Sequence, residues 1–515
     1  MVDSLTQISR MSQSTTRSST EYPLQSVFIK WGSVAALLGG VCFVSPLAGL
    51  AFFVVFAVAG AVWRPGEPAL AYCLAFQWLF IVTGYFYFCV TGAYPEDGIV
   101  GDIDAAVLLC LAGLIALAAG MRSGIAVLAK TVDNSRPNSK DWQTPYDIPR
   151  LFWLTIAFGA VNWFTEISPM LIWFDGAQII YRLLQFRHLF FFLLLLTVIR
   201  RQHGFDYGAV AFLVYLVPAL TSHMSAFSGP FIVLFLAAVS EWRPWSRHGW
   251  ERWRSNRAYR HAAVIAMLLV VMGLVWTGGV KGVWRPRVLS GEVSGSPLDK
   301  AFAFTATVAE TAPNIRVGSA GHDLSKRMSS DVGYFADTLA RVPVVVPHAN
   351  GNLTWRAVNH VLKPRILFPD KENLGSDSWL VELYAGRAAA GWESNTSIAL
   401  GYMAEFYIDY GIPGMFVALF TLGTLVGLLY RSAILFCPSY DLYRAVVFGL
   451  AAHFSTYGAE LAKMTGGLLQ TYIIFGGLLL VLGRPIHRFL LTPQASIAVP
   501  KRRRPWKAIV HVRSR

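Results

Sequence analysis

The chain has 515 residues, of which 55% are hydrophobic and only 14% are charged. Soluble domains carry about 25% charged residues, so this composition excludes an ordinary soluble protein and indicates an integral membrane protein. The formal charge of +14 lies mostly in short loops and the C-terminal tail, as positive-inside topology requires, and it does not indicate a nucleic-acid partner.

The chain begins with a polar tail, which is followed by apolar runs long enough to cross a bilayer core of about 30 Å. Residues 1–27 are rich in Ser and Thr and lack apolar periodicity, which predicts a disordered cytoplasmic tail. The first apolar run, 31–63, is too long for one helix. Ser45 and Pro46 interrupt it, so we expect a helical hairpin.

The later apolar segments complete an all-α, polytopic membrane protein with about twelve transmembrane helices. Helices one to nine occupy 28–279, and helices ten to twelve occupy 412–484. One of them, at 177–199, carries Arg182, Arg187 and His188, which are unusual in a spanning segment. The helices expected after the hairpin are 69–90, one ending near Gly120, 151–174, 177–199, two within 207–242 divided at 221–230, 261–277, 412–430, 443–458 and 466–482.

The distribution of charge predicts the topology. If about twelve helices alternate across the membrane, the basic loops fall on one side, and an acidic loop at 96–104 falls on the other side together with the long segment 280–411. Both termini are then cytoplasmic, including the basic tail 485–515, and 280–411 is a large extracytoplasmic loop. The basic loops lie near 64, 122–150, 200, 243–260, 431–444 and 484–504. No strong internal repeat marks an inverted-repeat transporter.

Segment 280–411 carries the basic and aromatic residues that suit a lipid-linked polar substrate. Lys281, Arg285 and Arg287 follow an apolar helix, at the depth of lipid headgroups, where guanidinium groups match phosphate oxygens. The alternative is that these residues only anchor the end of the helix. Further basic candidates are Arg341, Arg356, Lys363, Arg365 and Arg387. The tryptophans Trp284, Trp355, Trp379 and Trp392 either stack on sugars or anchor the protein at the membrane interface.

Glu405 and Asp409 are spaced i, i+4, which places both carboxylates on one face if the stretch is helical. A break at 411–414 follows, so 396–411 is expected to form a re-entrant or interfacial helix that lines a polar cavity. The alternative is a structural pairing of these carboxylates with loop arginines.

The sequence carries no signature of a metal or nucleotide site. The loop histidines His322, His348 and His360 match no zinc spacing, and all five cysteines lie in or beside apolar segments outside the long loop. No Walker loop, dinucleotide fingerprint or nucleophile elbow is present. We therefore expect neither a metal nor a cofactor, although a single histidine can still act as a general base.

Three stretches resemble the O-antigen or oligosaccharide repeat-unit polymerases of bacteria (the Wzy type) and their exopolysaccharide-polymerase relatives. The main motif reads ESNTSIALGYMAEFY over 393–407, followed by DYG at 409–411 and by Gly414. The stretch PRILFPDK at 364–371 and the helix end at 276–285 are similar to the same group. The resemblance extends over about residues 270–430, and elsewhere it rests on hydropathy.

This resemblance implies an enzyme of the bacterial inner membrane that joins two undecaprenyl-diphosphate-linked oligosaccharides on the external leaflet and releases undecaprenyl diphosphate. A hydroxyl group of one glycan attacks the anomeric carbon of the other, so the reaction needs a general base and a site for the diphosphate. The candidate bases are Glu405, Glu393 and His348, and the candidate substrate-binding residues are Lys281, Arg285, Arg287, Arg356, Arg365, Tyr402 and Asp409.

The expected partners are the lipid-linked oligosaccharide, membrane lipids, a chain-length regulator and a flippase, with no nucleic acid. Two alternatives stay open at this stage. One is a ligase-like transferase that moves a whole glycan to another acceptor. The other is a flippase or transporter that carries out no chemistry.

Overall fold

The computed structural model describes residues 24–64, 66–133, 144–167, 183–221, 228–241, 257–363, 368, 370–371, 377–388, 398–455 and 457–492. Every regular element in these residues is a helix, and the β-type pairings among them are two isolated bridges, Arg64–Glu67 and Tyr146–Leu491. The predicted all-α class is confirmed for this part of the chain.

The predicted hairpin is present at the N-terminus as α2 (Leu24–Cys42) and α3 (Pro46–Val62). Ser45 ends the turn as the N-cap of α3, because its hydroxyl accepts a 3.2 Å hydrogen bond from the Ala48 N–H, and Pro46 takes the first helical position. The same hydroxyl lies 2.7 Å from the hydroxyl of Tyr85 on α4 (Ala69–Thr91), which fixes the hairpin against the next helix.

The helix predicted to end near Gly120 does not end there, since α5 runs over Ile103–Asp133. A Cβ atom on Gly120 would lie 2.1 Å from the Phe420 carbonyl oxygen of α18 (Tyr402–Ser432), and one on Gly124 would lie 2.2 Å from that of Thr424. Gly423 and Gly427 lie equally close to the α5 backbone. These glycines are therefore the points where two long helices pack backbone to backbone, as small-xxx-small pairs do in membranes.

The middle of the chain forms α6 (Ile148–Ile167), α8 (Phe186–Arg201), α9 (Phe205–Thr221), α10 (Ser228–Ser240) and α12 (Arg257–Val275). The predicted division of 207–242 at 221–230 is confirmed, because α9 ends and α10 begins within that stretch. The parts of the predicted helices that fall at 168–182, Arg182 included, and most of the predicted basic loop at 243–260 lie outside the described residues.

The segment predicted as a large loop is mostly helical in its described residues. A π-helical turn, η4 (Trp276–Val280), joins α12 to α13 (Lys281–Leu289), and Gly279 within it has φ 174° and ψ −46°, so the two helices meet at a kink next to the predicted boundary. The elements that follow are α14 (Pro297–Thr311), η5 (Ala312–Asn314), α15 (Val317–Arg341), α16 (Asn352–Leu362), α17 (Ser378–Leu380) and η6 (Val381–Ala385).

The predicted break before the last helices is present as a kink inside α18. Gly411 has φ 60° and ψ −161°, and Ile412 has φ −103° and ψ 129°, so 402–410 and 413–432 are two separate helical pieces. Gly411 adopts a positive φ that residues with a Cβ atom rarely adopt. The chain ends with η8 (Ala433–Leu435), α19 (Tyr440–Ala452) and α20 (Leu461–Leu490).

Five helical segments in the described residues are long and apolar enough to cross a membrane: Ala69–Thr91, Ile103–Ala129, Ala263–Leu289, Tyr402–Leu435 and Leu461–Leu490. Shorter apolar helices accompany them, among them Pro46–Val62 and Phe205–Leu220. These segments indicate a membrane protein, and the number of twelve spans stays a prediction.

A buried network of ion pairs joins several helix ends at one end of the molecule. Arg200 of α8 binds Asp441 of α19 through both guanidinium nitrogens, at 2.8 Å and 2.9 Å, and also binds Glu241 at 2.9 Å. Arg444 binds Glu241 at 2.9 Å and donates a 2.6 Å hydrogen bond to the carbonyl oxygen of Gly66. Loops that are far apart in sequence therefore meet here.

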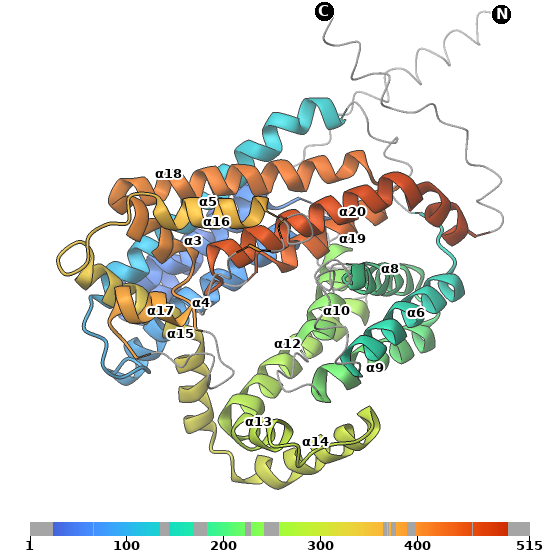
Figure 1. Ribbon diagram of the computed structural model, residues 1–515, viewed down its shortest axis with the longest axis horizontal. Coiled ribbons are helices and arrows are strands. Elements are labelled where there is room, and N and C mark those ends of the chain that lie inside the picture. The colour runs from blue at the N-terminus through green and yellow to red at the C-terminus, as the bar shows by residue number, and fades with distance from the viewer. Residues whose placement is uncertain are drawn as a thin grey trace, which may run out of the picture.

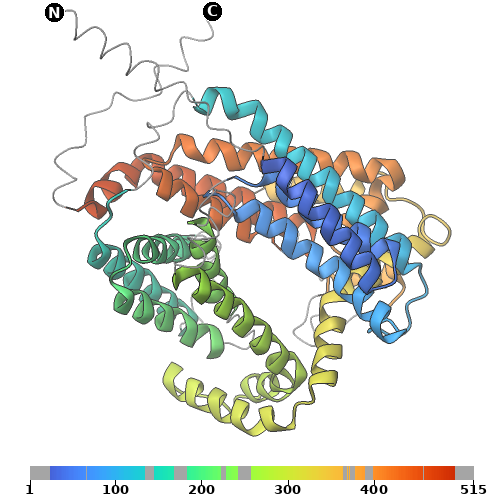
Figure 2. The same ribbon diagram turned by 180° about the vertical axis from the view of Figure 1, so that it is seen from behind.

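Figures 1 and 2 show α2–α5, α18 and α20 as one bundle, with α6, α8, α9, α10 and α12 gathered beside it. Helix α15 packs on α4 and α5 within the bundle and also contacts η4, so it connects the bundle to the α12–α14 region.

Candidate functional site

The two carboxylates predicted to share a face do so, and each one caps the N-terminus of another helix. Glu405 Oε1 accepts a 3.0 Å hydrogen bond from the N–H of Leu461, the first residue of α20. Asp409 accepts hydrogen bonds from the N–H groups of Leu353 (3.0 Å) and Thr354 (2.6 Å) at the start of α16. Both carboxylates are buried, and α16 packs against α20. The N-terminal piece of α18 thus holds the first turns of two helices.

Two more acidic residues and one lysine lie beside Glu405. Asp377 is the N-cap of α17 and Glu460 is the N-cap of α20, and the charge of Asp377 acts on the Glu460 carboxyl. Lys463 Nζ forms an ion pair with Asp377 and lies 3.7 Å from Glu460 Oε2. We call Asp377, Glu405, Glu460 and Lys463 the carboxylate cluster. Its acidic side chains are buried, but the side chain of Lys463 is 52% exposed, so the cluster reaches solvent through this lysine.

The electrostatics of the cluster favour the retention of a proton. Burial raises the pKa of the Glu460 carboxyl, and the neighbouring charges of Asp377 and Glu405 raise it further, while Lys463 opposes them. The Glu460 carboxyl therefore has a pKa raised to about 8. A carboxyl group of this kind can accept a proton from a substrate hydroxyl group or return one.

A group of cations lies at the end of the spanning segment Ala263–Leu289. Lys281 and Arg285 are one turn apart on α13, and the charge of Arg327 on α15 acts on both of them. We call these three residues the cation group. Helix α15 approaches closely here, because a Cβ atom on Gly278 would lie 2.5 Å from the Cβ of Ala320. Arg327 is exposed and forms no ion pair among the described residues, so the group is open to an anion.

Helix α15 connects the cation group to the carboxylate cluster. Asp331 lies one turn beyond Arg327, and burial raises the pKa of its carboxyl to about 6 although the Arg327 charge opposes this. A Cβ atom on Gly458 would lie 2.1 Å from Asp331 Oδ2, and Gly458 is two residues before Glu460. One helix therefore reaches from the cation group to the segment that holds the acids.

Other predicted site residues have partners elsewhere. Arg287 binds Glu310 at 3.3 Å and Thr307 at 3.2 Å, so it joins α13 to α14. Tyr402 is fully buried, and its hydroxyl donates a 2.6 Å hydrogen bond to Gln77 of α4. His348 Nδ1 lies 3.2 Å from the Ile408 carbonyl oxygen, beside the kink in α18.

Arg356 stacks on an aromatic residue at the surface. Its guanidinium lies 5.4 Å from the centre of the Trp379 ring. Trp355 is 67% exposed and is available to stack on a sugar, whereas Trp284 is fully buried against Phe304. The predicted base Glu393, the predicted phosphate ligand Arg365 and Trp392 lie outside the described residues.

Arg387 connects the acidic loop at 96–104 to the long helical segment. It binds Glu96 at 3.0 Å and also forms an ion pair with Asp337. Asp337 Oδ1 in turn accepts hydrogen bonds from the N–H groups of Val100 (2.7 Å) and Gly101 (3.1 Å). Burial raises the pKa of the Glu96 carboxyl to about 7, with Arg387 opposing this effect. The two regions that the charge pattern assigned to one side of the membrane are therefore in direct contact.

Sequence reasoning missed Asp377, Glu460, Lys463 and Arg327. These residues belong to separate segments, and none of them stands in a recognisable motif. An acidic residue at the start of a long apolar helix, as Glu460 is for α20, was the one local signal available. Within the described residues, no group of three or more His, Cys, Asp or Glu side chains is arranged to hold a metal ion.

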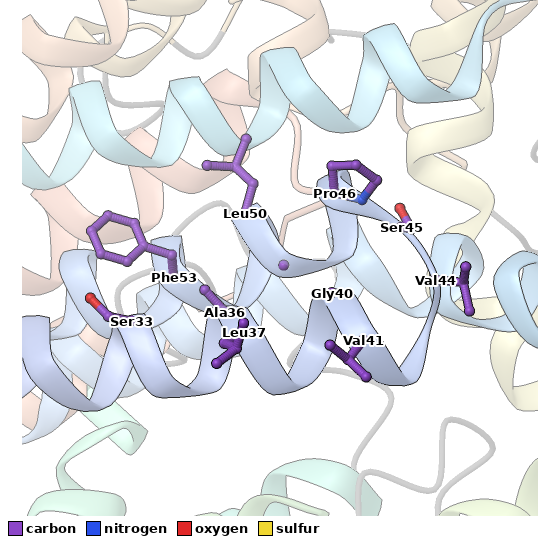
Figure 3. A pocket seen from close by; sticks show the side chains of 11 residues that line it. Ser33, Ala36, Leu37, Gly40, Val41, Val44, Ser45, Pro46, Leu50 and Phe53 are labelled. Atoms are coloured by element: carbon purple, nitrogen blue, oxygen red, sulfur yellow. The ribbon is translucent and has the colours of Figure 1, made fainter.

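A separate surface groove of about 670 Å³ lies between α2 and α3. Figure 3 shows its lining of small and apolar side chains, among them Ala36, Leu37, Leu50 and Phe53, with the hydroxyls of Ser33 and Ser45 at its edge. It contains no charged residue and offers a shape for a lipid chain rather than a site for chemistry.

The described residues form an all-helical fold that indicates a membrane protein, in which α15 connects the cation group to the segment that holds the buried acids. The chain belongs to a family described as a domain of unknown function (DUF8712), which matches residues 177–482. The match includes every member of the carboxylate cluster and of the cation group. No curated protein and no solved structure matches the chain.

Proposed function

We propose that the protein is a polysaccharide polymerase of the bacterial inner membrane, which joins undecaprenyl-diphosphate-linked oligosaccharide repeat units. The observation that carries this proposal is the pairing of two groups across α15. Two half-buried cations and one exposed arginine stand at the end of a membrane-spanning segment, and one helix leads from them towards buried acids. The sequence resemblance over about 270–430 covers the cation group, Asp377 and Glu405, whereas Glu460 and Lys463 lie beyond it.

The cation group binds the diphosphate of the donor lipid. Lys281, Arg285 and Arg327 stabilise the charge that develops on the leaving diphosphate as its bond to the anomeric carbon breaks. Guanidinium forks suit this role, because they bind phosphate oxygens bidentately and keep their charge. Arg287 does not take part, since acidic residues of α14 and the loop before it already bind it.

The carboxylate cluster supplies the base. The hydroxyl oxygen of the acceptor glycan forms the new glycosidic bond, and its proton passes to the Glu460 carboxylate. Glu460 is the best-placed base, because its partner Lys463 is open to solvent. Glu405, the first candidate from the sequence, accepts a hydrogen bond from the Leu461 N–H at the start of α20 and thereby orients Glu460.

In the proposed topology the chain crosses the membrane about twelve times. Both termini lie in the cytoplasm, and segment 280–411 lies on the extracytoplasmic side. The ion-pair network supports this arrangement, because described residues of the basic loops near 64, 200 and 431–444 meet in it. The bond between Arg387 and Glu96 supports the same arrangement from the opposite end.

The length of glycan chains in a deletion strain tests the proposal. Loss of polymer with single repeat units retained supports a polymerase. Intact polymer that is no longer attached to its acceptor identifies a ligase-like transferase, and repeat units trapped in the cytoplasm identify a flippase. Each of the last two results would replace the proposed reaction.

A further inference from the structure

One side of helix α16 packs on the apolar helices beside it. Leu353 and Ala357 are buried, and Val361 follows on the same side, because these residues are spaced i, i+4 and i+8. A Cβ atom on Gly466 of α20 would lie 3.3 Å from Val361 Cγ2, so this side of α16 faces α20. Figure 1 shows α16 alongside α18, which it also contacts.

A second apolar stripe lies next to this packed side and is exposed. Trp355, Val358 and Leu362 are spaced i, i+3 and i+7, so they share one face of the helix. They are 67%, 41% and 65% exposed. We call these three residues the α16 stripe. The apolar side of α16 is therefore wider than the part that the protein covers.

The remaining side of α16 is polar. Asn352, Asn359 and Lys363 are exposed and spaced i, i+7 and i+11, and Arg356 lies among them. The helix thus presents three sides in turn, of which one packs on the protein, one is apolar and exposed, and one is polar. An amphipathic helix at a membrane interface has this pattern, because its apolar side enters the lipid while its polar side stays in water.

Both ends of α16 are fixed, so the exposure of the stripe is a property of the folded protein. At the start of the helix, Asp409 accepts hydrogen bonds from the N–H groups of Leu353 and Thr354. Near its end, the carbonyl oxygen of His360 accepts a hydrogen bond from Lys371 Nζ. An exposed apolar stripe on a helix held in this way marks a surface that contacts a partner.

The stripe starts where a spanning segment exposes apolar side chains of its own. Gly351, the N-cap residue of α16, lies on the same side as the stripe, and a Cβ atom on it would lie 3.3 Å from the Tyr410 ring. Tyr410, Ile412 and Val417 of α18 are all exposed, and they belong to the spanning segment Tyr402–Leu435. Exposed apolar side chains of a spanning segment face lipid. The α16 stripe therefore continues a lipid-facing surface.

We propose that the α16 stripe is a lipid-contact face, and that its partner is the phospholipid bilayer. Val358 and Leu362 contact acyl chains, and Trp355 suits the boundary between acyl chains and headgroups, where tryptophan is enriched. Trp355 alone would also suit a sugar ring, but Val358 and Leu362 offer a glycan neither a ring face nor a hydrogen bond. The inference rests on the membrane-spanning segments and not on the proposed reaction.

This face relates the carboxylate cluster to the bilayer. Arg356, on the polar side of α16, stacks on Trp379, which is two residues from Asp377 of the cluster. Asp409, which holds the start of α16, lies one turn from Glu405 on α18. Contact between the stripe and the bilayer therefore fixes the height of these acids relative to the lipid headgroups.

Photocrosslinking from single positions of the full-length protein tests the inference. Trp355 and Leu362 are each replaced by p-benzoylphenylalanine, and the purified protein is irradiated in vesicles of phosphatidylethanolamine and phosphatidylglycerol. Mass spectrometry of the protein is expected to show a phospholipid adduct at both positions. The matched control is the same replacement at Asn359, on the polar side of α16, where the phospholipid adduct should fall to background. Val358 takes the place of either stripe position at which the protein does not fold.

Other results would overturn the inference. A crosslinked dimer at Trp355 and Leu362 would identify a second copy of the chain as the partner, and protection of both positions by an added oligosaccharide would identify a glycan surface. Equal phospholipid yields at Asn359 and Leu362 would mean that the bilayer does not select this face. A protein that polymerises nothing but keeps both phospholipid adducts leaves the lipid-contact face in place and removes only the proposed reaction.

Discussion

Glu405 accepts a 3.0 Å hydrogen bond from the backbone of Leu461, and the residue before Leu461 is Glu460. One carboxylate thus fixes the backbone that carries another. A glutamine at 405 can still accept this bond through its amide oxygen, whereas a glutamine at 460 can no longer act as a base. The two substitutions therefore separate a positioning role from a catalytic one.

We expect Glu460→Gln to lower the turnover of lipid-linked repeat units by roughly a hundredfold to ten-thousandfold, the usual contribution of general base catalysis. Glu405→Gln should stay within a few-fold of wild type. Both effects are measured as turnover by the purified protein. Glu382→Gln is the control, because Glu382 on η6 is exposed. If Glu405→Gln abolishes turnover but still binds the lipid substrate, the base is Glu405, as the sequence alone predicts.

The pH profile gives a second measurement of the same base. A general base must be deprotonated, and burial raises the pKa of Glu460 above the ordinary range of a glutamate. The rate kcat/KM should therefore rise with pH through this raised pKa and level off above it. A profile that is flat from pH 5 to 9 (about the range where a shifted carboxyl would titrate) contradicts the assignment.

The cation group predicts a graded response to substitution. Arg285→Ala and Arg327→Ala each remove a charge-assisted contact to the leaving diphosphate, so we expect a loss of about 1.5–3 kcal/mol, or roughly tenfold to a hundredfold in rate. Arg285→Lys should retain more of the wild-type rate than Arg285→Ala but not all of it, because it keeps the charge and loses the bidentate fork. Polymer length and the rate of lipid-linked substrate use report the effect.

Arg287→Ala is the matched control for the cation group. It removes an arginine two residues away whose partners are Glu310 and Glu292, both exposed, and such surface pairs contribute about 0–1 kcal/mol. The rate at which the Arg287→Ala variant uses lipid-linked substrate should stay near that of the wild-type protein. An equal loss in Arg287→Ala and Arg285→Ala would mean that the substitutions disturb α13 rather than phosphate binding.

Local signals in the sequence located the breaks in the chain but not all of the helix ends. Ser45-Pro46 and the kink at Gly411 were predictable, because capping, proline and glycine act on the residues beside them. The prediction that a helix ends near Gly120 was wrong, because the role of this glycine depends on its contact with Phe420, which lies 300 positions away in the sequence. No local rule distinguishes a glycine that ends a helix from one that admits a second helix.

The candidate site was predictable only in part, because its side chains meet through contacts between distant segments. The i, i+4 spacing of Glu405 and Asp409 correctly predicted one shared face, but their partners are backbone N–H groups of α16 and α20, which carry no sequence signal. Asp377 and Glu460 come together only when α17 meets α20. The site thus depends on tertiary contacts that composition and spacing do not specify.

The glycine contacts between α5 and α18 predict a large cost for a single methyl group. A Cβ atom on Gly423 would lie 2.2 Å from the Leu117 carbonyl oxygen, so Gly423→Ala must push two backbones apart. We expect a loss of about 1–3 kcal/mol, as for other overpacked sites, measured by thermal unfolding in detergent. Gly477→Ala on α20, where nothing lies within 4 Å, should not lower the melting temperature. Equal melting temperatures for the two variants would contradict the backbone contact.

The ion-pair network predicts strong coupling between helices that are distant in sequence. Arg200→Ala leaves the buried Asp441 carboxylate without its bidentate partner, so we expect a loss of about 3–5 kcal/mol in the free energy of unfolding. Arg201→Ala, one residue further along α8, removes an arginine that forms no ion pair among the described residues. It should lower the free energy of unfolding only slightly.

A double-mutant cycle then isolates the pair itself. Arg200→Ala combined with Asp441→Ala removes both charges, and the double variant should be more stable than the sum of the single losses implies, by about 0.5–3 kcal/mol. Additive losses would mean that Arg200 stabilises α8 independently of Asp441. A positive coupling energy, measured by unfolding in detergent, would establish that α8 and α19 are held at a common end.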